Sequence, residues 1–515
     1  MGTDVEVKAA AGRATETIDL AGRLLSPGFT DAHVHAVYGG LERIGCDLSP
    51  CQGMSEVLAR VRDYAGSSEK EWVTGGGWTM TDFPGGTPGR ELLDAILPDR
   101  PAYLVNRDRH GAWVNSRALE LAGVNAATPD PSDGRIERDG AGNPTGTLHE
   151  GAMEMVARHI PPPSIEELTD GLLEAQRHLH AHGVTGWQEA IIGDYAGYPD
   201  VSGAYLRLQG EGLLSGRATG ALWVPRSTTV DNIAELVTDF TERRHVNTAG
   251  GFPTTSAKIM VDGVPENQTA AMLQPYENPC TCGGPVGSTG LTYLPEEVLR
   301  EASAALDRAG FDLHMHVIGD RAVRSGLNAV AHTRRLNGRG VGRHHMAHIQ
   351  IIHPADIARF AELDVTANAQ ALWASNSAQM TDLTIPLLGA ERAGWQYPFG
   401  SLVSSGARLA MGSDWPVSTP DPWQAIHVAV NRTEPRHPDQ APLVPDQALD
   451  LTTALMAYTH RSAWLNRQET AGRIKTGYLA DLVMLDRNPF EQGQQDLYDV
   501  RTQLTVVDGK VAYHA

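Results

Sequence analysis

The sequence has few of the features that mark a secreted or membrane-bound protein. Only four of its 515 residues are cysteines, which disfavours a framework of structural disulfide bonds. Their spacing, with Cys46 near Cys51 and Cys280 near Cys282, fits no paired-cysteine zinc motif. No apolar stretch approaches the roughly 20 residues that cross a bilayer, and no apolar signal segment opens the chain. We therefore expect a cytoplasmic protein without a membrane anchor.

Positive charge is also scarce. Lysine and arginine number 42 against 62 aspartate and glutamate residues, so the formal net charge is -20, and no Lys/Arg-rich block stands out. Such a chain is poorly suited to nucleic acid or an anionic membrane surface, since both demand concentrated positive charge. What the chain does have is length, because 515 residues suffice for a large barrel and an accessory domain.

Two histidines one residue apart, His33 and His35, give the clearest chemical signal. They end an apolar run that begins at Leu25 and reads as a strand. Side chains alternate along a strand, so both imidazoles point to the same side. Two neutral imidazoles side by side can hold one divalent metal ion. Taken alone, the pair is equally compatible with two polar residues at the end of a strand.

Further candidate ligands stand in four later strand-like runs. They are Lys258, His316, His348 and Asp414, and helix-like stretches such as residues 295–306 separate the runs. The strand ends of a (β/α)8 barrel meet at one face of the molecule. These side chains are therefore expected to converge on one site together with the two histidines.

The order of the segments predicts an α/β fold built as a (β/α)8 TIM barrel. Eight strands are expected, at residues 27–35, 183–189, 218–224, 256–262, 311–317, 344–349, 364–370 and 408–414. The interval between the first two strands is far too long for one crossover helix. It is interpreted as an inserted subdomain, at about residues 70–165, that covers the barrel mouth.

Three motifs stand out along the chain: Pro-Gly-Phe-Thr-Asp-Ala-His-Val-His (27–35), Gly-Asp-Arg-Ala-Val (319–323) and Gly-Ser-Asp-Trp-Pro-Val (412–417). Together they resemble the motifs of the amidohydrolase superfamily. More narrowly, the chain resembles the third amidohydrolase family, in the YtcJ-like branch that includes N-substituted formamide deformylases. That branch also shows the motifs at 110–116, 146–150 and 472–483. The resemblance runs from about Leu20 to the C-terminus.

The resemblance implies a small composite β-sandwich made from both chain ends. Residues 482–486 and 503–512 alternate as strands do, with a hairpin turn at Asp508-Gly509. The N-terminal piece, including residues 18–20, would pair with them. The chain then divides into residues 1–25 (N-terminal part of the sandwich), 26–460 (barrel) and 461–515 (C-terminal part).

The resemblance also implies a metal centre. His33, His35 and Asp414 would hold one ion, and His316 and His348 a second. Imidazole and carboxylate ligands suit zinc, although other divalent metals are compatible, and one or two ions would serve. Asp414 would in addition be the catalytic residue that carries a proton.

Lys258 is the unusual member of the set, because an ammonium group cannot bind a cation. The resemblance implies that carbon dioxide carboxylates it, which would give an anionic bridge between two metals. The alternative is a structural lysine that pairs with Asp262 or Asp320. A single metal held by His33, His35, Asp414 and one further histidine would then be adequate. His314, two residues before the predicted ligand on its strand, is expected to be a buried barrel residue.

The implied function is that of an enzyme, a metal-dependent hydrolase acting on carbon–nitrogen bonds other than peptide bonds. Metal-activated hydroxide would cleave the N-formyl or N-acyl amide of a small hydrophobic or aromatic substrate. A decarboxylase, isomerase or cyclase on the same scaffold is the alternative, since Ala347 stands where the family usually has glutamate. The expected partner is a small molecule, with no nucleic acid and no membrane, and a homodimer is one option.

Substrate specificity is only weakly encoded in the sequence. Candidate substrate contacts, set against ordinary packing as the alternative, are Trp78, His110, Trp113, Gln268 and Trp373. Aromatic side chains near the strand ends would favour an aromatic or hydrophobic group on the substrate.

Overall fold

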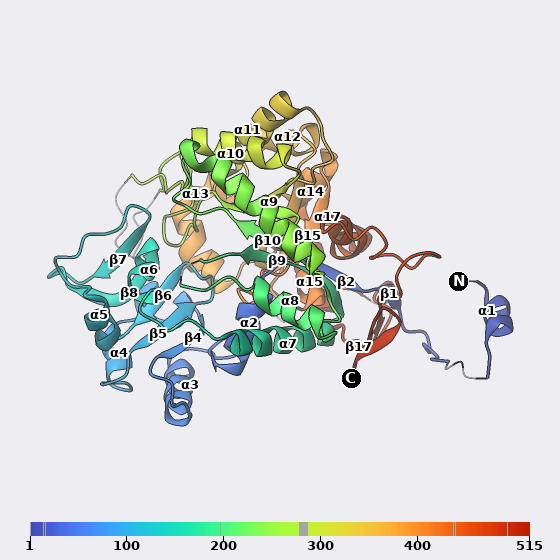
Figure 1. Cartoon of the computed structure of the whole chain (residues 1–515), viewed down its shortest axis with the longest axis horizontal. Coiled ribbons are helices and arrows are strands. Elements are labelled where there is room, and N and C mark those ends of the chain that lie inside the picture. Colours follow the sequence, from blue (N-terminus) through green and yellow to red (C-terminus); the bar gives the residue numbers. More distant parts are fainter. Residues whose placement is uncertain are drawn as a thin grey trace.

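Eight parallel strands form the centre of the computed structural model, which describes residues 2–13, 15, 17–195, 197–277, 287–435, 437, 439–491 and 493–515 (Figure 1). In sheet order they are β2 (Phe29–Val34), β9 (Val184–Ile192), β10 (Arg217–Trp223), β11 (Ser256–Met260), β12 (Asp312–Val317), β13 (His345–His348), β14 (Thr366–Ala369) and β15 (Leu409–Met411). Each overlaps one of the eight predicted strands. The predicted (β/α)8 barrel is therefore confirmed.

Hydrogen bonds just beyond the last strand join β15 to β2 and close the barrel. The Asp414 amide donates to the His33 carbonyl at 2.7 Å, and the His35 amide donates to the Trp415 carbonyl at 2.8 Å. Below them the buried Asp31 carboxylate accepts from the Ser413 amide and hydroxyl at 3.0 and 2.5 Å. Burial raises the pKa of Asp31 to about 7. These contacts between β2 and the residues after β15 form the closing seam of the barrel. They fix His33, His35 and Asp414 relative to one another.

Amphipathic helices cover the outside of the barrel. In α10, for example, Val298, Leu299, Ala302 and Leu306 are buried on one face, as helical spacing dictates. The α-helices of the described residues, among which α1 lies apart from the barrel and α3 to α6 belong to the inserted subdomain (Figure 1), are α1 (Asp4–Ala10), α2 (Ala36–Ile44), α3 (Met54–Ser67), α4 (Arg90–Asp94), α5 (Ser116–Ala122), α6 (Gly151–Ala157), α7 (Ile165–Ala181), α8 (Ser202–Gly210), α9 (Ile233–Ala249), α10 (Glu296–Arg308), α11 (Asp320–Asn337), α12 (Ile357–Glu362), α13 (Ile385–Ala393), α14 (Phe399–Ser404), α15 (Pro422–Asn431), α16 (Leu451–Met456) and α17 (Ser462–Leu465). Within the described chain none is long and apolar enough to cross a membrane.

A second, six-stranded sheet lies between β2 and β9 in the sequence and forms the blue-to-cyan lobe at the lower left of Figure 1. Its order is β3 (Cys46–Asp47), β4 (Val73–Trp78), β5 (Ala102–Asn106), β6 (Gly111–Val114), β8 (Pro144–Glu150) and β7 (Gly134–Arg138). Because β3 belongs to this sheet, the lobe begins before residue 70. The sequence pattern did not show this, since β3 has only two residues. Cys46 and Cys51 are free and buried here, whereas Cys280 and Cys282 lie outside the described residues.

The two chain ends meet in a four-stranded antiparallel sheet. Its order is β1 (Leu25–Pro27), β16 (Leu482–Leu485), β17 (Thr502–Val507) and β18 (Lys510–His514). The prediction that residues 18–20 supply the N-terminal strand is wrong. The chain turns at Ala21, where φ is 47°, and only then reaches β16. The described residues thus form a single composite sheet at this end of the molecule.

Candidate metal centre and active site

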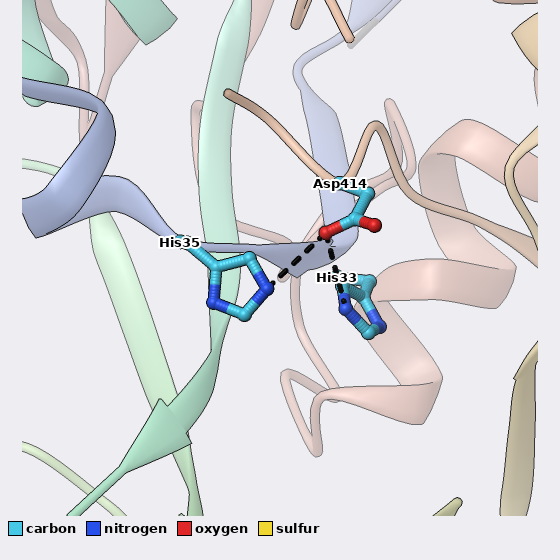
Figure 2. A group of neighbouring side chains, drawn as sticks. All are labelled: His33, His35 and Asp414. Carbon is cyan, nitrogen blue, oxygen red and sulfur yellow. Dashed lines mark ion pairs between the residues drawn. The ribbon is translucent and has the colours of Figure 1, made fainter. Parts of the chain in front are cut away.

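Three predicted ligands meet at the carboxyl ends of β2 and β15. His33 Nε2 and His35 Nε2 lie 3.3 and 3.2 Å from Asp414 Oδ1 (Figure 2). One ligand atom from each residue falls within 4.8 Å of the others. His33 and His35 reach the same point because they are two residues apart at a strand end, as the sequence predicted.

One buried oxygen of this cluster lacks the hydrogen bond that such a group normally makes. Asp414 Oδ1 is buried and accepts none, although two imidazole nitrogens face it. Burial lowers the pKa of His33 to about 3 and also lowers the pKa of His35, so both imidazoles are neutral electron-pair donors. Burial alone would raise the pKa of Asp414, but His33 and the other imidazoles hold it well below its usual value. A divalent cation fits this set of donors.

His348 and His316 stand beside the cluster, on β13 and β12. Their ring centroids are 4.4 Å apart, and His348 Nδ1 lies 3.9 Å from Asp414 Oδ2 without a hydrogen bond of its own. His316 Nδ1 is 3.4 Å from the buried carboxylate of Asp262. His348 and Asp414 also have left-handed backbones, with φ of 74° and 56°. Such strained residues gather at functional sites, because the surrounding structure must hold them in place.

Lys258 ends inside the same cluster. Its Nζ lies 3.4 Å from His33 Nε2. The alternative pairing of this lysine with Asp262 or Asp320 is not what the structure shows. Asp262 accepts three backbone amides, from Ala271, Ile318 and Gly319, and Asp320 accepts the Leu273 amide. Burial lowers the pKa of Lys258 to about 7, so a neutral amine is accessible near neutrality.

Two residues outside the predicted ligand set, His314 and Glu189, support the histidines. His314 is a buried barrel residue, as expected, but its Nε2 also lies 2.8 Å from His33 Nδ1 and fixes that ring. The buried Glu189 carboxylate accepts the Ala36 and Val37 amides at 3.1 and 3.4 Å, at the start of α2 directly after His35. Burial raises the pKa of Glu189 to about 8. Neither contact could be inferred from the sequence, because both depend on how distant strands are aligned.

A cleft of about 660 Å³ opens over the ligand cluster. Its lining includes two of the predicted substrate residues, His110 and Trp373, and all six predicted metal ligands. Trp373 stacks on His348, with ring centroids 5.2 Å apart and planes 7° from parallel. Other apolar side chains in the wall are Tyr38, Tyr198, Met260, Met380 and Trp415. The cleft therefore offers aromatic and apolar surface next to the candidate metal centre.

Three other substrate candidates require correction. Trp78 and Trp113 are fully buried in the core of the inserted lobe, where both pack edge-on against Phe83. Their indole nitrogens donate to the carbonyls of Leu104 and Gly89, so both residues belong to packing. Gln268 is buried in the loop after β11, with φ of 55°, and does not line the cleft.

Glu150, the last residue of the motif at 146–150, is a polar group that the sequence did not assign to the site. Its Oε1 lies 2.7 Å from His110 Nδ1. Burial alone would raise the pKa of Glu150, but His110 and Arg226 lower it to about 2. Burial alone would lower the pKa of His110, but Glu150 raises it above its usual value. The motif includes Glu150, but its burial and its contact with His110 are visible only in the structure, where the buried carboxylate finds the partner it needs.

Comparisons with known proteins show which family the sequence matches. The sequence pattern of the Amidohydrolase family matches residues 16–513. The putative amidohydrolase YtcJ of Bacillus subtilis (strain 168) is 28% identical, over 97% of this chain and 90% of its own. The N-substituted formamide deformylase of Arthrobacter pascens is 27% identical, over 100% and 92%. A solved structure, an uncharacterized metal-dependent hydrolase from Pyrococcus furiosus, is 25% identical with a TM-score of 0.67, over 94% and 91%.

Proposed function

Because the chain belongs to the amidohydrolase family, we propose that it cleaves the carbon–nitrogen bond of small N-formyl or N-acyl amines, other than peptides, with a divalent metal. The similarity to a metal-dependent hydrolase supports hydrolysis as the general activity. The observation that carries the proposal is the convergence of His33, His35 and Asp414 under a cleft with apolar walls. The formamide deformylase relative favours N-formyl amines among the candidate substrates.

In this proposal His33, His35 and Asp414 hold the metal, with His316 and His348 as further ligands. Zinc suits these ligands best. A divalent ion bound there supplies Lewis acidity, which polarises a carbonyl group and acidifies water. The neutral amine of Lys258 adds to carbon dioxide with loss of one proton and becomes a carbamate, an anion that can bind a cation where an ammonium group cannot.

Asp414 moves the proton in this reaction. Its carboxylate is ionised and lies in the cleft wall, so it can accept a proton from the attacking water. It then returns that proton to the leaving nitrogen, and the products are a carboxylic acid and an amine. The closing seam of the barrel keeps its backbone in place through the hydrogen bond to the His33 carbonyl.

Trp373 and the tyrosines of the cleft provide surface for the substrate's amine substituent. Flat, apolar walls bind aromatic groups through burial and stacking. Because Trp373 also stacks on His348, a substrate ring in this region lies close to the reacting centre. We therefore propose that aromatic N-formyl amines are better substrates than short aliphatic ones.

A substrate panel tests the proposal directly. Purified protein with added zinc is incubated with N-formyl and N-acetyl derivatives of aromatic and aliphatic amines, and with dipeptides as the comparison. We expect release of free amine from the N-formyl aromatic compounds, detected by mass spectrometry. Products that retain the carbon–nitrogen bond would instead favour the decarboxylase, isomerase or cyclase alternative. Cleavage of dipeptides alone would contradict the proposed bond class.

A further inference from the structure

The inserted lobe contributes an imidazole, that of His110, to the lining of the cleft, next to Arg107, Asp108 and Arg109. His110 follows β5, and its ring centroid lies 5.6 Å from that of His316. The imidazole lines the same cleft as the candidate metal ligands and is only 8% exposed. An imidazole with so little exposure, next to the proposed reaction centre, is placed to meet the substrate rather than bulk water.

A network of contacts holds His110 in this position. Nδ1 contacts Glu150 Oε1 at 2.7 Å, and Glu150 also accepts the Thr269 hydroxyl at 2.9 Å and pairs with Arg226 at 3.5 Å. The Asn267 side chain donates to the His110 carbonyl at 3.1 Å. Thr269, Asn267 and Arg226 come from loops of the barrel, so the network ties the inserted lobe to the barrel at this histidine.

Two residues at this contact have strained backbone conformations. Glu150 has φ of 52° and Arg109, the residue before His110, has φ of 66°. Non-glycine residues rarely adopt this region, and they do so where the structure needs a particular direction of the side chain. Glu150 is one partner of the imidazole–carboxylate contact, and Arg109 directly precedes the other partner. The strained backbone therefore directs the His110 and Glu150 side chains toward each other.

We propose that His110 is a catalytic residue whose Nε2 forms a hydrogen bond to the reacting amide group of the substrate, and that Glu150 is its positioning residue. In the described part of the chain, Nδ1 is engaged with Glu150 and Nε2 has no hydrogen-bond partner. This inference rests on the proposed hydrolysis of an amide. It makes the inserted lobe a part of the active site and not only a cover.

The first test compares two histidine variants of the same lobe. His110→Asn removes the imidazole, while His149→Asn is the matched control, because His149 forms a similar contact, 3.2 Å to Glu137, without lining the cleft. Hydrolysis of N-(2-phenylethyl)formamide should lose about 10²–10³-fold in kcat in His110→Asn with KM little changed, as for other preorganised hydrogen bonds to reacting groups. Metal content should match the wild type, and thermal unfolding should show that both variants remain folded at the assay temperature. Equal losses in both variants would overturn the proposal.

The second test asks whether Glu150 acts through His110. Glu150→Gln should lower kcat by itself but add nothing in the His110→Asn background, because the residue it positions is already gone. An additive loss would show that Glu150 is merely structural. The double-mutant cycle therefore separates positioning from general destabilisation.

A binding probe keeps this inference distinct from the proposed function. Benzohydroxamic acid needs no turnover, and calorimetry should show about tenfold weaker binding to His110→Asn than to wild type or His149→Asn, as expected for one lost hydrogen bond. One outcome is that the wild type cleaves no amide while the hydroxamate still binds more weakly to His110→Asn than to the other two proteins. In that case the proposed function is wrong, but the contact between His110 and a bound ligand is supported. Equal affinity in all three proteins, or no binding to any, would overturn the inference.

Discussion

Replacing Asp414 by asparagine changes a charge and little else. The side chain keeps its volume, so an oxygen can remain about where Oδ1 now lies, 3.3 and 3.2 Å from the two imidazoles of His33 and His35. What is lost is the negative charge and the ability to accept a proton. Proton transfer by a positioned group supplies about 10²–10⁴-fold in rate, so kcat should fall by at least about 10².

The assay must separate proton transfer from metal loss. Kinetics are therefore measured at saturating zinc, with the bound metal quantified in the same samples, from about pH 5 to about pH 9. The wild-type carboxylate stays ionised over this range because its pKa is held well below the usual value. Raising the pH should therefore not restore the variant. Asp356→Asn is the control, since Asp356 is a buried carboxylate that pairs with Arg324 and Arg359 on the barrel exterior. Near-normal turnover of the Asp414 variant with the wild-type pH profile would refute the reasoning.

Three further predictions follow from the surroundings of the cluster. Lys258→Ala should lose activity, and acetate should partly restore it by supplying a carboxylate; no rescue at any acetate concentration would count against the carbamate. His314→Ala should weaken zinc binding about 10–100-fold, measured by competition with a chelator, because His33 loses the contact that fixes its ring. The pKa of Glu189 is raised to about 8, above the value of 4.5 in an unfolded chain, so the fold favours the protonated carboxyl and loses stability as the pH rises between these values. Glu189→Gln should accordingly unfold at least about 2 °C above the wild type at about pH 9 but not at about pH 4, and equal melting curves at both would contradict the assignment.

The barrel could be read from the sequence because its signals are local. Each strand is a short apolar run, and the candidate ligands stand at its end, as with His33 and His35 or with Asp414. Strand alternation and the common direction of parallel strands then require these residues to meet. The structure shows that convergence for His33, His35 and Asp414.

Other parts of the molecule depend on contacts that no local pattern contains. Trp78 and Trp113 carry the same chemistry as Trp373, yet two are core residues and one lines the cleft. Whether a tryptophan is a core residue or lines the cleft depends on how the inserted sheet packs, which the sequence does not show. Likewise the contact between His110 and Glu150 joins residues 40 positions apart through the pairing of β6 with β8. The two-residue β3 was missed because it has no periodicity to detect.

The most direct test of the account is to remove the metal and restore it. Protein stripped with a chelator is assayed for hydrolysis of the N-formyl substrate and for bound metal, before and after zinc is added back, beside a variant that carries both His33→Ala and His35→Ala. We predict one to two equivalents of a divalent ion in active wild type, no activity in stripped protein and recovery on adding zinc. The double variant should neither bind the metal nor show activity. Full activity in metal-free protein would contradict this prediction.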